Sequence, residues 1–129
     1  MTDLAPIASY HAHVYYSAAE RPAAAGLRAR IDADFSVQLG RWHDGPVGPH
    51  PTGMYQVAFR PDQFATLVPW LMLNRAGLVV LVHPNTGDPY RDHLTHALWL
   101  GAVLPLTAAG LPRHEVPSPV VPNSAGSGG

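Results

Sequence analysis

Residues 9–16 (SYHAHVYY) alternate between two kinds of side chain, with the two-residue period of a β-strand. Ala12 and Val14 lie on one face of this predicted strand, together with two tyrosines. His11 and His13 lie on the opposite face. The strand therefore presents one face that suits a core and another that carries a pair of imidazoles.

Three further segments are predicted strands. Residues 35–39 and 54–60 alternate like the first segment. Residues 78–82 (LVVLV) form a continuous apolar run, which is typical of a strand that is covered on both faces. The dipeptide His83-Pro84 follows directly, and we expect it to end this last strand.

Two segments have the features of helices. Ser17 and Glu20 form the S-x-x-E pattern of a capping box, and the alanine-, leucine- and arginine-rich residues 18–31 predict the first helix. Residues 62–76 carry apolar side chains at helical spacing, Met72 among them, and predict the second helix.

The predicted elements follow in the order strand, helix, strand, strand, helix, strand. Because crossover connections are right-handed, this order favours an α+β fold, a ferredoxin-like sandwich with a four-stranded antiparallel sheet. Its strands would lie in the order fourth, first, third, second, with both helices on one face. The other face, to which His11 and His13 point, would be open to a partner, a ligand or the C-terminal segment. We expect a dimer, because exposed apolar sheet is otherwise a liability.

The chain of 129 residues is predicted to form a single domain and a tail. We expect the ferredoxin-like domain to span residues 1–110, with a short helix or strand at 94–100. Residues 111–129 are rich in proline, glycine and serine, so we expect a loosely held tail there.

Composition excludes several classes of function. The chain has eight arginines, no lysine and nine acidic residues, so nucleic acid and anionic membranes are not expected as partners. The absence of cysteine excludes disulfides, thiolate zinc sites, iron–sulfur clusters and a cysteine nucleophile. No apolar stretch approaches the ~20 residues that span a bilayer, and the start lacks the pattern of a signal peptide. We therefore expect a soluble, cytoplasmic protein.

Eight histidines beside nine carboxylates suggest a metal site, because imidazole is the commonest metal ligand in proteins. His11 and His13 would stand about 6.5 to 7 Å apart on one strand face, close enough to share an ion. In the predicted sheet the end of the fourth strand lies beside the start of the first, which brings His83 toward His11. These three histidines are the predicted metal ligands, at positions that we expect to be half-open.

Other residues could complete the metal site. His50 lies in the loop before the third strand and His93 follows the fourth, while Asp44, Asp88 and Asp92 are the nearby carboxylates. The usual non-heme iron site has two histidines and one carboxylate, and an all-histidine set is the alternative. Since hard oxygen ligands are few and thiolates absent, iron, zinc, copper or nickel suits such a site better than magnesium or calcium. Oxygen chemistry favours iron(II).

Four stretches of the chain resemble the DOPA 4,5-dioxygenase family: YHAHVYY, GRWHDGPVGPHPTGMYQVAF, LVVLVHPNTGD and DHLTHALWLG. The resemblance covers residues 10–101. It implies a ferredoxin-like, typically dimeric protein that opens the ring of a catechol such as DOPA by extradiol cleavage, using non-heme iron and dioxygen.

The resemblance also marks site residues. The histidines of the family's HxH, GPHP, VHP and DH motifs fall here on His11, His13, His50, His83 and His93. It does not distinguish metal ligands from acid–base groups. We expect His93 and His50 to be catalytic, with His93 carrying a proton. The expected cofactor is iron(II), with zinc or another divalent metal as an alternative occupant.

Arg41 and Arg91 are predicted to bind the substrate, because a guanidinium can hold a carboxylate through two hydrogen bonds. Two functions other than that of a dioxygenase remain open. One is a non-catalytic dimeric module that binds a metal or a small aromatic ligand, and the other is a cofactor-independent enzyme whose histidines act as acid and base. Metal content separates the last of these from the others, and ring-opening activity separates the dioxygenase from the binding module.

Overall fold

The computed structural model describes residues 7–116, in which five strands form one sheet. The strands are β1 (Ser9–Tyr16), β2 (Gln38–Leu39), β3 (Gly53–Phe59), β4 (Val80–Asn85) and β5 (Leu98–Leu100). The helices are α1 (Arg21–Asp34), the 3-10 helix η1 (Pro61–Gln63), α2 (Phe64–Asn74) and α3 (Pro89–His93). None of the helices within residues 7–116 is long and apolar enough to cross a membrane.

The sheet is antiparallel throughout, in the order β2-β3-β1-β4-β5. The four strands that the sequence predicts have the neighbours expected of them. The prediction of a four-stranded sheet is nevertheless wrong by one strand, because a fifth strand, β5, pairs with residues 80–82 of β4. The expected dimer stays a prediction.

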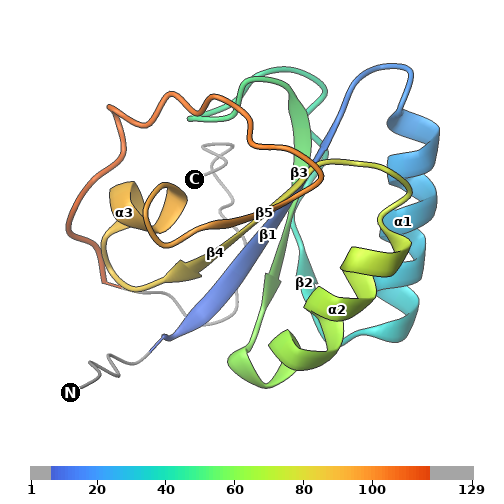
Figure 1. The fold of residues 1–129 in the computed structure, drawn as a ribbon, viewed down its shortest axis with the longest axis horizontal. Coiled ribbons are helices and arrows are strands. Elements are labelled where there is room, and N and C mark those ends of the chain that lie inside the picture. The colour runs from blue at the N-terminus through green and yellow to red at the C-terminus, as the bar shows by residue number, and fades with distance from the viewer. Residues whose placement is uncertain (1–6, 117–129) are drawn as a thin grey trace.

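The main core lies between the sheet and two helices. Figure 1 shows α1 and α2 on one side of the sheet. The alternation of side chains along β1 and β3 turns one set of apolar residues toward these helices. This core includes, from β1, β3 and α1, the buried residues Ala12, Val14, Val57, Leu27 and Ile31. The residues of β1 between these positions therefore face the other side of the sheet.

The opposite side of the sheet is covered by α3 and by the segment 101–116, which runs across it (Figure 1). Leu104 and Leu106 of this segment pack against Tyr15 and Leu81 of the sheet. Of the three occupants expected for this face, the structure therefore places the C-terminal segment there. The histidine positions on this side are buried rather than half-open.

The predicted capping box forms, but it precedes the helix. The N–H of Ser17 donates to the carboxylate of Glu20 (2.9 Å), and the N–H of Glu20 donates to the hydroxyl of Ser17 (3.2 Å). The helix α1 begins at Arg21 rather than at residue 18, with Pro22 in its first turn, where the missing N–H of proline is tolerated.

The second strand is shorter than predicted. Of residues 35–39, only Gln38–Leu39 pair with β3. Phe35 caps the end of α1, and both Phe35 and Val37 are half-buried against the main core. Packing against the helices therefore takes precedence over strand pairing at these positions.

The fourth strand does not end at His83-Pro84 but continues to Asn85. Pro84 stands opposite Tyr10 of β1, and β5 pairs only as far as Val82. On that side β4 is an edge strand at Pro84, so the missing N–H of proline costs no ladder hydrogen bond. His83 consequently lies inside the strand, where its side chain has a defined direction.

The second predicted helix begins as η1 and continues as α2, which ends at Asn74 rather than at residue 76. Ala76 and Gly77 have positive φ angles of 58° and 76°, which stop the helix. The sequence pattern places Met72 on the apolar face, but its side chain is 50% exposed, whereas Leu71 is buried. The buried face of α2 is therefore narrower than the sequence pattern predicts.

Two substitutions on α2 test this orientation. We expect Leu71→Ala to lower the free energy of unfolding by about 2–5 kcal/mol, because it leaves a cavity in the core. Leu73→Ala, at a position that is 86% exposed, should change it by less than about 0.5 kcal/mol. Urea unfolding followed by circular dichroism measures both, and equal losses would contradict the orientation.

Candidate metal centre

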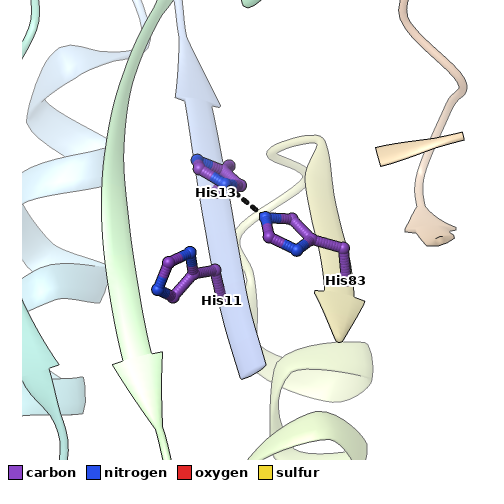
Figure 2. Close-up of side chains that lie close together, drawn as sticks. All are labelled: His11, His13 and His83. Atoms are coloured by element: carbon purple, nitrogen blue, oxygen red, sulfur yellow. Dashed lines mark hydrogen bonds between the residues drawn. The ribbon is translucent and has the colours of Figure 1, made fainter. Parts of the chain in front are cut away.

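Three imidazoles from neighbouring strands meet on the sheet face that α3 and the segment 101–116 cover. The antiparallel register places His11 opposite His83, and His13 lies further along the same face of β1. Nε2 of His13 and Nε2 of His83 are 3.0 Å apart (Figure 2). One nitrogen from each of the three rings lies within 4.8 Å of the other two, so the trio could hold one metal ion.

A second trio shares His13 with the first. His50 comes from the loop between β2 and β3, and His93 is the last residue of α3. The ring centre of His13 is 4.3 Å from that of His50 and 5.8 Å from that of His93. The rings of His83 and His93 are 4.0 Å apart. The five histidines predicted as site residues thus form one cluster, and each is 5% exposed or less.

A tight turn and the C-terminal segment hold the loop that carries His50. The N–H of His50 donates to the carbonyl of Val47 (2.9 Å). Gly48 lies between them with a φ of 53°, a left-handed conformation that suits glycine. The N–H of Thr107 donates to the carbonyl of Pro49 (2.9 Å). The proline- and glycine-rich sequence therefore builds a fixed turn here.

Tyr15 determines which nitrogen of His50 carries the proton. Its hydroxyl lies 2.6 Å from Nδ1 of His50, and among the described residues it has no other hydrogen-bond partner. If this buried hydroxyl only accepted a bond, its own proton would be unpaired, so the O–H donates to Nδ1. The neutral ring of His50 then holds its proton on Nε2. This nitrogen is a donor rather than a ligand atom.

His83 and His93 show the opposite arrangement. Nδ1–H of His83 donates to the carbonyl of Pro84 (2.9 Å), and Nδ1–H of His93 donates to the carbonyl of Pro89 (2.7 Å). A carbonyl only accepts, so the neutral rings keep their lone pairs on Nε2. Metal-binding histidines are typically held in this way. Nε2 of His93 is buried with no hydrogen-bond partner among residues 7–116, which suits a site for a cation.

Carboxylates position the short helix α3. Asp88 caps it by accepting a backbone N–H of its first turn (3.0 Å). Asp92, which is 2% exposed, accepts bonds from the N–H (2.8 Å) and O–H (2.6 Å) of Thr86 and from Nδ1 of His96 (3.0 Å). These bonds fix the turn that brings His93 into the cluster.

Within residues 7–116, both groups of side chains that could hold a metal ion by their spacing consist of histidines alone. Asp44 accepts bonds from the hydroxyl of Tyr16 (2.8 Å) and from the guanidinium of Arg21 (2.9 Å). Asp88 and Asp92 are engaged in holding α3. Of the two ligand sets that the sequence left open, the geometry favours the one made of imidazoles.

Burial favours the neutral form of three of these imidazoles, those of His13, His83 and His93. The pKa of His13 lies well below its ordinary value, first because the ring is desolvated and then because the other imidazoles surround it. Desolvation also lowers the pKa of His83 well below its ordinary value, followed by the effect of neighbouring imidazoles. The pKa of His93 is lowered by desolvation, against the opposing effect of its bond to Pro89. Since metals bind neutral imidazole, the cluster can accept a cation at neutral pH.

The two arginines predicted to bind substrate have exposed side chains. The side chain of Arg91 is 60% exposed and lies 3.7 Å from the carboxylate of Asp88. Arg41 is exposed in the loop after β2. Their role in substrate binding stays a prediction.

Sequence reasoning missed two residues that support the site. The alternation along β1 puts Tyr15 on the histidine face, but the pattern says nothing of its bond to His50, 35 positions away along the chain. Thr86, which holds Asp92, lies in a segment that reads only as a turn. The Tyr15–His50 bond joins segments that are far apart in the sequence, whereas the Thr86–Asp92 bonds span six positions in a turn whose geometry the sequence pattern does not specify.

An open pocket of about 340 Å³ lies beside the cluster. Its walls come from the turn after α3, from β5 and from the segment 101–116. The lining residues are His93, Leu94, Thr95, Trp99, Val103, Leu104 and Leu106. A ligand in this pocket would therefore meet the cluster at His93.

Fold and site define an α+β protein with a buried, all-imidazole centre beside an apolar pocket. The sequence model of the Dopa 4,5-dioxygenase family matches residues 10–109. The chain belongs to this family.

Two curated proteins are similar to the chain. It is 40% identical over 122 residues to a DOPA 4,5-dioxygenase of Amanita muscaria, covering 86% of this chain and 54% of that protein. It is 37% identical over 110 residues to an uncharacterized 21.2 kDa protein of Botryotinia fuckeliana, covering 76% of this chain and 60% of that protein. The chain thus spans little more than half the length of these relatives.

A solved structure is also similar. A crystal structure from Nostoc punctiforme, described as a candidate dioxygenase, superposes with a TM-score of 0.81 at 59% sequence identity. The match covers 84% of this chain and 94% of that chain. The fold of the chain is therefore that of this solved protein.

The lowered pKa values predict how stability depends on pH. Well above pH 6.5, His13, His83 and His93 are neutral in both the folded and the unfolded chain, whereas at lower pH the unfolded chain binds protons at these positions that the folded cluster excludes because the pKa values are lowered. For protein treated with a chelator, we expect the free energy of unfolding to fall between pH 7.5 and 5.5, by up to about 1.4 kcal/mol per pH unit for each of His13, His83 and His93. Urea unfolding at several pH values measures this. His13→Gln should make the dependence shallower, and a free energy that does not change with pH would contradict the prediction.

The bond between Tyr15 and His50 predicts a change that nuclear magnetic resonance can detect. In the wild-type protein we expect the ¹⁵N shifts of His50 to report the proton on Nε2. Tyr15→Phe removes the donor, so this preference should be lost, and the free energy of unfolding should fall by about 1–3 kcal/mol because Nδ1 is left unpaired. Tyr10→Phe, on the same strand, is the control and should leave His50 unchanged. An unchanged His50 spectrum in Tyr15→Phe would refute the assignment.

Proposed function

We propose that this protein is a non-heme metal-dependent dioxygenase that opens the ring of a catechol by extradiol cleavage. The observation that carries the proposal is the convergence of His11, His13 and His83, whose nitrogens lie within 4.8 Å of one another in a buried site. Membership of the Dopa 4,5-dioxygenase family supports the reaction class. DOPA and related catechols are the substrates to which that name points.

His11, His13 and His83 are the proposed metal ligands, with iron(II) as the native metal and zinc as an alternative occupant. The 3.0 Å separation of the two Nε2 atoms suits nitrogens that share one ion, since metal–nitrogen bonds measure about 2.0–2.1 Å. The carbonyl of Pro84 holds the ring of His83 in the required tautomer. Bound iron(II) would supply a redox-active Lewis acid at which a catechol and dioxygen react.

His93 is the proposed acceptor of the proton that the catechol must lose. It lines the pocket, and its Nε2 keeps a lone pair because Nδ1–H is bonded to Pro89. A base that touches both substrate and cluster can take a hydroxyl proton as the substrate binds. The lowered pKa of His93 means that this base is unprotonated at neutral pH.

His50 is the proposed proton donor. Tyr15 keeps the proton of its neutral ring on Nε2. A fixed N–H in a buried site stabilises negative charge that develops on oxygen, because little water competes for the bond. The segment 101–116 helps to exclude that water by covering the sheet face.

Anaerobic reconstitution tests the proposed reaction. Chelator-treated protein is loaded with iron(II) under nitrogen, mixed with a catechol and then exposed to air. We expect uptake of one dioxygen per catechol and a yellow ring-opened product whose mass has increased by both oxygen atoms. If a panel of catechols gives neither oxygen uptake nor product, the proposal is wrong.

Three variants separate ligands from proton carriers. Because the sites are buried, glutamine is preferred to alanine, which would leave a cavity. We expect His13→Gln and His83→Gln to weaken metal binding by tenfold or more, measured by metal content after dialysis. His93→Gln should lower kcat more than it lowers metal content.

The control for these variants is His114→Gln, at an exposed position outside the cluster. It should change neither metal content nor kcat. Equal losses of metal and kcat in His93→Gln would make His93 a ligand. Full metal occupancy in both His13→Gln and His83→Gln would reject the proposed ligand set.

A further inference from the structure

The pocket beside His93 is lined mainly by apolar side chains. Its walls are formed by Leu94, Trp99, Val103, Leu104 and Leu106, together with Thr95 and His93. Leu104 and Trp99 also belong to the apolar cluster on this side of the sheet. The indole of Trp99 stacks on Tyr15 at 5.8 Å between ring centres, so one wall is a fixed aromatic surface.

None of the described lining residues carries a formal charge. The nearest charged groups along the chain are those of α3, and they have partners: Arg91 lies beside Asp88, and Asp92 accepts bonds from Thr86. An ammonium or carboxylate in this open pocket would lose part of its hydration and would meet no opposite charge among the described lining residues, which is unfavourable. An uncharged, apolar part of a ligand would lose much less favourable hydration on entering the pocket.

We infer that the preferred substrate of this chain is a catechol whose ring substituent is uncharged and apolar, rather than an amino acid such as DOPA. The inference rests on the proposed function, because it takes the pocket to be the place where the substituent lies. The catechol oxygens face the histidine cluster, and the substituent extends between Trp99 and the segment 101–116. The pocket volume of about 340 Å³ accommodates a ring with a short alkyl chain.

Four probes that share one ring test the inference: 4-propylcatechol, dopamine, dihydroxyphenylpropionate and DOPA. With iron-loaded protein we expect 4-propylcatechol to have a kcat/KM that exceeds the DOPA value by tenfold or more. Calorimetric titration of the same protein under nitrogen should rank the affinities in the same order without turnover. An equal or greater preference for DOPA in both measurements would overturn the inference.

A substitution in the pocket wall makes the test specific. Val103 lines the pocket and is 75% exposed, so Val103→Arg can be accommodated without loss of core packing. It should strengthen binding of dihydroxyphenylpropionate relative to 4-propylcatechol by fivefold or more, in both titration and kinetics. Leu73→Arg, at an exposed position on α2, is the matched control and should leave that ratio unchanged. An unchanged ratio in Val103→Arg would place the substituent outside the pocket.

Arg91→Ala tests the competing arrangement, in which Arg91 binds a carboxylate of the substrate. If Arg91 holds a substrate carboxylate, this variant will weaken binding of DOPA and dihydroxyphenylpropionate but not of 4-propylcatechol, and the inference is then wrong. We expect equal, small effects on all four probes. If no probe is turned over, the proposed reaction fails, while the order of affinities under nitrogen still decides the nature of the pocket.

Discussion

The antiparallel pairing of β1 with β4 is the constraint on which the site depends. It sets His83 opposite His11 and brings Nε2 of His83 to 3.0 Å from Nε2 of His13. A slip of one residue in either strand would turn its histidines into the helix-covered core and its apolar residues out of it. The same alternation that buries Ala12 and Val14 therefore holds the imidazoles together, so the fold and the site are selected by one register.

The donor set has a consequence for charge. Imidazoles are neutral ligands, and the nearby carboxylates are bonded elsewhere, so the cluster does not itself offset the charge of a divalent ion. In the proposed reaction an ionised catechol would provide that balance, which favours binding of the substrate in its deprotonated form. In the proposed complex, a neutral donor set and an apolar pocket would leave the catechol oxygens as the anionic group of the site.

Much of this arrangement could be predicted from the sequence, because it depends on local patterns. Alternation identifies the faces of β1, and the order of elements is sufficient to bring His83 toward His11. The remaining features depend on contacts between separated segments, such as the Tyr15–His50 bond and the packing of Leu104 on the sheet. Strand boundaries are less predictable, since Pro84 is tolerated only because β5 ends before it.

A backbone hydrogen bond connects the segment 101–116 to the turn that carries His50. The N–H of Thr107, just after the pocket-lining Leu106, donates to the carbonyl of Pro49, next to His50. A ligand that displaced the segment 101–116 from the sheet would therefore break this hydrogen bond or shift the turn that carries His50. Displacement of this segment and the orientation of the His50 ring would therefore be coupled through the hydrogen bond between Thr107 and Pro49.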